Sequence, residues 1–129
     1  MEPLEPRLGQ AYAQALLAIA RMDGEITPKE AARVRELVAR RSTVEIDFEA
    51  SFFDKQTPET LADIVMRAGP AVVQPRQLGR ALVSDAVVLA TADGDLNGVE
   101  AHAILRFARA LGCTAEDVAQ ETRQLDEWL

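Results

Sequence analysis

Four acidic residues, two in each of two similar turns, are the side chains of this sequence best suited to chemistry. They are Asp23 and Glu30 in the first turn, and Asp93 and Glu100 in the second. In each turn the aspartate precedes a glycine, and the glutamate follows seven residues after the aspartate. Carboxylate oxygens are the ligands that calcium and magnesium prefer. We therefore take these four residues as candidate ligands of a divalent cation, calcium or magnesium.

The two turns belong to an internal duplication. Residues 20–37 and 90–107 align with a shift of 70 residues. The pairs that are identical or conservatively exchanged are Ala20/Ala90, Asp23/Asp93, Gly24/Gly94, Glu25/Asp95, Ile26/Leu96, Glu30/Glu100, Ala31/Ala101, Val34/Ile104 and Leu37/Phe107. Such a duplication places two acidic turns in one small domain, so function is to be sought there first.

Each turn matches only the second half of an EF-hand calcium loop. That loop needs oxygen ligands at its first and third positions, where this chain has Ile19 and Arg21, then Leu89 and Thr91. Calcium takes about 6 to 8 oxygens, more than one turn offers. A cation site therefore requires that the two turns meet, as they would if the duplicated halves pack about a pseudo-twofold axis.

The alternative interpretation of the motif is helix punctuation. Thr27 and Asn97 are typical N-cap residues, and the glutamate three positions after each completes a capping box. Capping explains the aspartates less well, because an aspartate at the carboxyl end of a helix meets the negative end of the helix dipole. Both interpretations stay open from the sequence alone.

Apolar residues at intervals of three and four predict helices through most of the chain. The expected ranges are 8–22, 28–41, 58–68, 76–92, 98–111 and 115–129, with Leu129 on the inner face of the last. For residues 42–57 a short helix is favoured over a strand, which would have no partner. We expect an all-α single domain, residues 1–129, that forms a compact bundle of six or seven helices built from two related helix-turn-helix halves.

Composition limits the function classes. The chain has 129 residues and a net charge of −7, with acidic runs at 45–63 and 115–129, which disfavours nucleic acid and favours cations or basic protein surfaces as partners. No apolar run approaches the ~20 residues of a membrane-spanning helix, the amino terminus lacks signal-peptide features, and Cys113 is the sole cysteine. These features predict a cytoplasmic protein without an integral membrane segment.

Other candidate residues have weaker support. His102 is expected to face solvent, and Cys113 is expected to be an ordinary thiol at a helix end. Asp85 lies in the most apolar helix and needs a partner such as Arg80 or another basic residue. No pairing of nucleophile and base, phosphate loop or metal triad is visible, so we expect no enzyme activity.

Two DG turns, each closing a buried helix and opening an amphipathic one, are followed by ALGCTAEDV at Ala110–Val118. In this the chain resembles the tellurite-resistance TerB family over nearly its whole length. The resemblance implies an all-helical domain, also found at the amino end of certain membrane-anchored DnaJ-like co-chaperones. It implies a bacterial stress-response role linked to tellurite resistance, with divalent-metal binding or the scaffolding of complexes near the membrane.

Transferred by motif, the family's functional positions are Asp23, Glu30, Asp93 and Glu100. The expected function is a non-catalytic binding module that recruits protein partners, peripheral membrane complexes included, modulated by a divalent cation at the paired acidic turns. The alternative is a divalent-metal sensor or sequestering protein. Neither the identity of the partner nor the oligomeric state follows from the sequence.

Overall fold

The computed structural model describes residues 3–22, 24, 26–42, 56–92 and 94–129. Its elements are α1 (Pro6–Ala20), α2 (Pro28–Ala39), α4 (Pro58–Ala68), α5 (Pro75–Thr91), α6 (Gly98–Ala110), α7 (Ala115–Glu121) and the short 3-10 helix η1 (Asp126–Trp128). Within these ranges the only extended pairing is an isolated bridge between Leu4 and Ser42. The predicted all-α class is confirmed.

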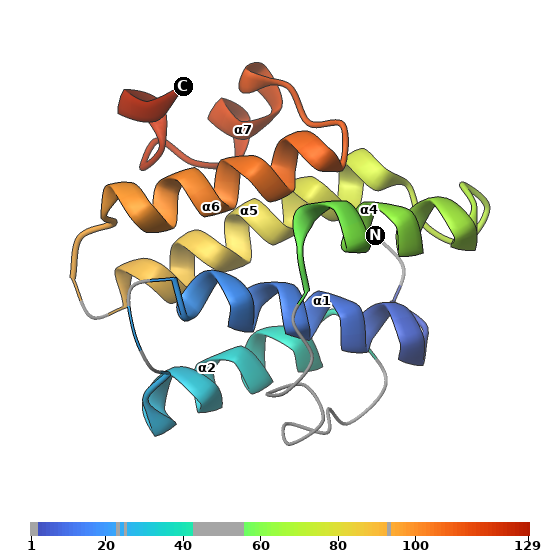
Figure 1. Cartoon of the computed structure of the whole chain (residues 1–129), viewed down its shortest axis with the longest axis horizontal. Coiled ribbons are helices and arrows are strands. Elements are labelled where there is room, and N and C mark those ends of the chain that lie inside the picture. The colour runs from blue at the N-terminus through green and yellow to red at the C-terminus, as the bar shows by residue number, and fades with distance from the viewer. Residues whose placement is uncertain (1–2, 23, 25, 43–55, 93) are drawn as a thin grey trace.

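Helix α5 lies at the centre of the bundle, as its apolar sequence predicts. It contacts each of the other five α-helices that the structure describes. Figure 1 shows α2 at one end of the bundle and α7 with η1 at the opposite end, with α1, α5 and α6 between them. Helix α5 thus carries side chains toward both ends of the molecule. Its second half borders a pocket that Glu30 and Glu100 also line, and its first half borders a separate surface hollow.

Four helices begin where the sequence predicts because a capping side chain satisfies their first free amides. Capping boxes open four helices, at Thr27, Thr57, Asn97 and Thr114. Helices α1, α2, α4 and α5 also begin with a proline, whose missing N–H costs nothing at this position. Both acidic turns therefore lead into a helix whose first turn is held by a capping box.

The predicted last helix is wrong in its second half. Helix α7 ends at Glu121, because Thr122 adopts an extended backbone with φ −158° and ψ 149°. The chain then forms η1, which buries Leu125 but leaves Leu129 42% exposed. The short helix predicted within residues 42–57 falls almost entirely on 43–55, outside the described residues.

Two further predictions concern the molecule as a whole. One acidic turn joins α1 to α2 and the other joins α5 to α6. That these pairs are equivalent halves of the bundle stays a prediction. None of the helices that the structure describes is both long and apolar enough to cross a membrane.

Candidate functional site

The two acidic turns share their local backbone geometry. Gly24 has φ 150° and Gly94 has φ 152°, values that a residue with a side chain rarely adopts. The Gly24 amide donates to the carbonyl of Arg21 at 3.3 Å, and the Gly94 amide donates to that of Thr91 at 3.4 Å. Each glycine thus lets the chain reverse direction within a few residues of the preceding helix.

Glu30 and Glu100 have the capping role that their spacing predicts. The Glu30 amide donates to Thr27 Oγ1 at 3.1 Å, and Glu30 Oε1 accepts from the Thr27 amide at 3.1 Å. The Glu100 amide donates to Asn97 Oδ1 at 2.8 Å, whereas the return bond to Glu100 Oε1 is longer, 3.5 Å. Both carboxylates also lie at the positive end of a helix dipole, which stabilises their charge. Capping is therefore one established role of these residues.

The same two glutamates line one pocket of about 250 Å³, which we name the acidic pocket. Its walls come from α1, α2, α5, α6 and the second acidic turn, and they consist of Ile19, Ala20, Glu30, Ala86, Leu89, Ala90, Gly94, Asp95, Asn97 and Glu100. Glu30 and Glu100 are 70 residues apart in the sequence, yet the fold brings them to a common cavity. Asp23 and Asp93, the other two predicted ligands, lie outside the described residues.

Sequence reasoning missed several residues of this pocket. Asp95 adds a third carboxylate to its wall, and the signal for it was present, since Asp95 aligns with Glu25 in the duplication. Small side chains make room for the cavity: Ala86 and Ala90 are one helical turn apart on α5, and Ala20 is near the end of α1. An alanine in an apolar helix predicts an ordinary buried position, so the sequence did not indicate that these three alanines border a pocket.

The chemistry of the described wall suits a hard cation. Glu30, Asp95, Asn97 and Glu100 present carboxylate and amide oxygens, the donors that calcium and magnesium take. A carboxylate has about four lone-pair sites, so a capping bond from one amide is compatible with a cation on the same group. Among the described residues, however, no three His, Cys, Asp or Glu side chains are grouped closely enough to hold a metal. Of the four predicted ligands, the described part of the chain includes Glu30 and Glu100, and their role as ligands stays a prediction.

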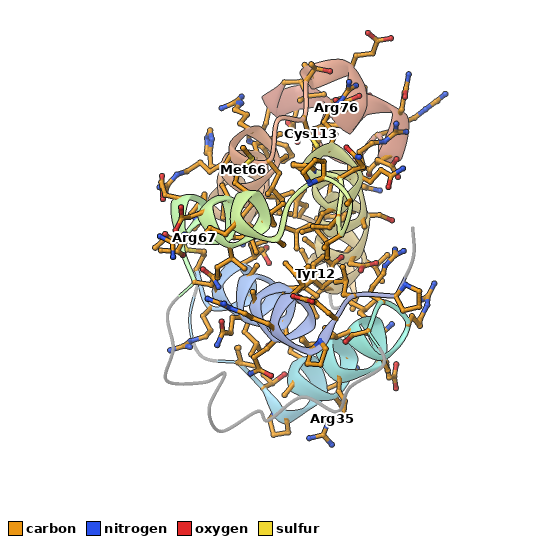
Figure 2. All side chains as sticks on the ribbon, turned by 90° about the vertical axis from the view of Figure 1, so that its right-hand side faces the viewer. Tyr12, Arg35, Met66, Arg67, Arg76 and Cys113 are labelled. Atoms are coloured by element: carbon orange, nitrogen blue, oxygen red, sulfur yellow. The ribbon has the colours of Figure 1, made fainter. Side chains whose placement is uncertain are left out.

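A second polar cluster lies in the core around Asp85. Asp85 Oδ2 accepts from the Tyr12 hydroxyl at 2.5 Å and from Arg41 Nε at 3.1 Å, and Oδ1 accepts from Arg41 Nη2 at 3.1 Å. Burial and the neighbouring carboxylate raise the pKa of Tyr12, and the bond to Asp85 raises the pKa of Arg41. In Figure 2 Tyr12 points into the interior of the bundle.

The predicted pairing of Asp85 with a basic residue is confirmed, but Arg80 is not the partner. Arg80 pairs instead with Glu121 of α7, Nε to Oε1 at 2.7 Å. The partner is Arg41, just beyond the end of α2. Sequence proximity on α5 suggested Arg80, whereas the packing of α2 against α5 decides the pairing.

The remaining candidates, His102 and Cys113, do not line the pocket of Glu30 and Glu100. His102 is exposed on α6, as predicted. Cys113 follows α6, is 6% exposed, and burial raises the pKa of its thiol. The Cys113 sulfur fills the space beside Gly79, since a Cβ atom on that glycine would lie only 2.6 Å from the sulfur. Figure 2 shows Cys113 near Arg76. A buried thiol of raised pKa is a poor nucleophile.

Comparison with known proteins gives one match. A family model described as tellurite resistance protein TerB matches residues 9–123. No curated protein matches the chain, and no solved structure matches it either. The matched range includes both acidic turns, the pocket that Glu30 and Glu100 line, and the Asp85 cluster.

Proposed function

Since the chain belongs to the tellurite resistance protein TerB family, we propose that it is a non-catalytic binding module in a bacterial stress response. It recruits protein partners in the cytoplasm, and a divalent cation at the paired acidic turns modulates that recruitment. The observation that carries this proposal is the common pocket of Glu30 and Glu100. If Glu30 and Glu100 had lined different surfaces, capping would have been the only role supported for the two turns.

The cation in this proposal is calcium or magnesium. Glu30 and Glu100 contribute one carboxylate from each turn, and Asp23 and Asp93 are proposed as the other two ligands. Asp95 and Asn97 add oxygen donors on the same wall. Because the ligands come from the ends of two helix pairs, a bound cation would hold α1–α2 against α5–α6. This gives the cation a means of altering the surface that partners contact.

A binding role, rather than catalysis, is supported by the placement of the reactive side chains. The chain has one histidine and one cysteine, and they are the exposed His102 and the buried Cys113. Neither lines the acidic pocket. Nucleophilic catalysis by a cysteine and a histidine needs the two side chains within reach of one another and of a substrate.

Calorimetric titration of the metal-free protein tests the cation site. The titrants are calcium, magnesium, manganese and zinc, and the matched variant carries Asp23→Asn together with Asp93→Asn. We expect the wild type to bind calcium or magnesium and the variant to lose most of that affinity. If neither protein binds any of the four cations, the motif is helix punctuation and the modulating cation must be abandoned.

The second candidate function is a divalent-metal sensor or sequestering protein. The common pocket favours it, because Glu30, Asp95 and Glu100 bring three carboxylates to its wall and carboxylate oxygens are the ligands that calcium and magnesium prefer. Affinity separates the two candidates. Binding at micromolar concentration or tighter, lost in the double variant, makes the cation itself the ligand of interest, whereas weaker binding fits modulation of a partner-binding surface.

A further inference from the structure

Helix α2 is attached to the bundle unevenly along its length. Its buried residues are Val34, Leu37 and Val38. All three lie in the second half of the helix, and no residue at positions 28–33 is buried. Helix α6, which follows the other acidic turn, already buries Ala101 in its first turns. Two helices that open with equivalent capping boxes therefore differ in how firmly their starts are packed.

The carboxyl end of α2 is fastened by several contacts. Arg41, two residues beyond the helix, donates through Nε and Nη2 to the two oxygens of Asp85 on α5, both at 3.1 Å. The Leu4 amide donates to the Arg41 carbonyl at 2.7 Å, and the Ser42 hydroxyl donates to the Leu4 carbonyl at 3.2 Å. Ser42 also packs so closely on Gly9 of α1 that a Cβ atom on this glycine would clash with it. This end of α2 is thus tied to both α1 and α5.

The amino end of α2 borders open space instead. Glu30 lines the acidic pocket of about 250 Å³, and Glu100 of α6 lines the same pocket. In Figure 1 the start of α2 and the start of α6 lie on the same side of the bundle. A further cavity of about 10 Å³ lies between this half of α2 and the end of α5, where Lys29, Arg33 and Leu89 border it. Since protein interiors are close-packed, such space leaves the first half of α2 room to move.

Two opposing influences act on the width of the acidic pocket. Glu30 from α2 and Glu100 from α6 carry like charges, which repel one another. The wall also includes the apolar side chains of Ile19, Leu89 and Ala90, whose burial favours a narrower pocket. Neutralising the two glutamates removes the repulsion and leaves the apolar contribution. We therefore expect their charge to decide how far the pocket stays open.

We propose that α2 is a hinged helix, which pivots about Arg41 and Asp85 and closes the acidic pocket when Glu30 and Glu100 are neutralised. A cation bound to both glutamates is one means of neutralising them. This inference rests on the proposed function and names the conformational change by which the cation acts. The first half of α2 moves toward α6, and its exposed face is then the surface whose position depends on the cation.

Distances between two spin labels test the pivot. The labels are placed on exposed positions, Ala32→Cys on α2 and His102→Cys on α6, in a Cys113→Ala background. We expect Glu30→Gln combined with Glu100→Gln to shorten this distance without any cation. The expected change is about 3 Å, since a tilt of about 10° over a helix of roughly 18 Å moves its end that far.

Two controls separate a pivot from other changes. In the first, a label at Ala39, at the end of α2 near the pivot, replaces the one at Ala32, and its distance to α6 should change by less than about 1 Å. In the second, Glu116→Gln with Glu127→Gln removes two exposed charges in α7 and η1, and the original distance should stay the same. Equal shifts at Ala32 and Ala39, or no shift in the pocket variant, overturn the proposal.

Hydrogen exchange gives a second test in unlabelled protein. The amides of residues 29–33 should exchange about threefold more slowly in the pocket variant, while those of residues 34–39 keep their rates. Arg41→Gln removes the pivot, so the second half of α2 should then exchange about tenfold faster. The matched control is Arg80→Gln, which breaks an ion pair with Glu121 of α7 and should leave these rates unchanged. Equal rates in the Arg41 variant and the wild type contradict the pivot.

The hinge and the cation site fail separately. Calorimetry reports cation binding, whereas the label distance in the variant with Glu30→Gln and Glu100→Gln needs no cation. Cation binding without a shorter distance, in either this variant or the cation-loaded wild type, rejects the hinge alone. A shorter distance in the variant, together with no cation binding by the wild type, supports the hinge and rejects the modulating cation.

Discussion

Asp85 and Glu100 are both buried carboxylates, 3% and 8% exposed, yet their surroundings differ. Both oxygens of Asp85 accept hydrogen bonds from Tyr12 and Arg41 within the core. Glu100 caps α6 through a 3.5 Å bond and faces a cavity that it shares with Glu30. The comparison teaches that burial alone does not mark a functional carboxylate. Asp85 is enclosed in the core with Tyr12 and Arg41, whereas Glu100 lies on the wall of a pocket, and this difference in position separates a structural residue from a candidate ligand.

Removing the charge of Asp85 should have the largest effect on stability. Asp85→Asn leaves the guanidinium of Arg41 without its counter-charge in a partly buried place, and we expect a loss of about 3 kcal/mol in the free energy of unfolding. Urea denaturation followed by circular dichroism measures it. The control is Asp63→Asn, which breaks the exposed pair with Arg67 and should cost less than about 0.5 kcal/mol. Equal losses in the two variants would contradict the structural role of Asp85.

Tyr12→Phe should have the next largest effect. It removes one donor to Asp85 while keeping the ring in a fully buried position, and we expect a cost of about 1 to 2 kcal/mol. Denaturation of the single variants and of the double variant with Asp85→Asn gives the coupling between the two side chains. Additive losses would mean that the hydroxyl and the carboxylate do not act as one network.

Glu100→Gln should behave in the opposite way to Asp85→Asn, with a small effect on stability and a large effect on cation affinity. The amide oxygen of glutamine keeps the capping bond, so we expect a loss in unfolding free energy below about 1 kcal/mol. Calcium or magnesium affinity should fall at least about tenfold, since a carboxylate ligand is lost. Denaturation and calorimetry on the same preparation provide both values. A large stability loss with unchanged cation affinity would place Glu100 in the same class as Asp85.

Asp117 is an intermediate case that acid titration can reveal. The bond from Arg76 first, and the amide of Thr114 second, lower the pKa of Asp117 to about 2. A carboxyl whose pKa is lower in the folded state stabilises the fold above its unfolded pKa of about 3.9 and loses that contribution as the pH falls toward 2. Asp117→Asn should therefore flatten the decline in stability between about pH 4 and pH 2. An unchanged decline would show that the ion pair does not form in solution.

Much of the fold follows from the sequence through local rules. The capping residues Thr27 and Asn97 start their helices as predicted, because a cap depends only on residues three positions apart. The end of α7 was not predictable in this way. Val118, Leu125 and Leu129 keep an apolar spacing, but the chain leaves the helix at Thr122 and places Leu125 in the core through η1.

The candidate site was predictable in its residues rather than in its shape. The duplication identified Glu30 and Glu100, but their common pocket depends on how α1, α2, α5 and α6 pack, which no local pattern records. The same limit explains the partner of Asp85. Arg80 lies five residues away along the chain, whereas Arg41 reaches Asp85 only because α2 packs against α5.

The central claim is that the two acidic turns form one cation site rather than two. Calorimetric titration of calcium and magnesium into the wild type, Glu30→Gln and Glu100→Gln tests it through stoichiometry. A shared site predicts one cation per chain in the wild type and a loss of that single event in each variant. Two cations per chain, with each substitution removing only one of them, would contradict the shared site and leave each turn to act alone.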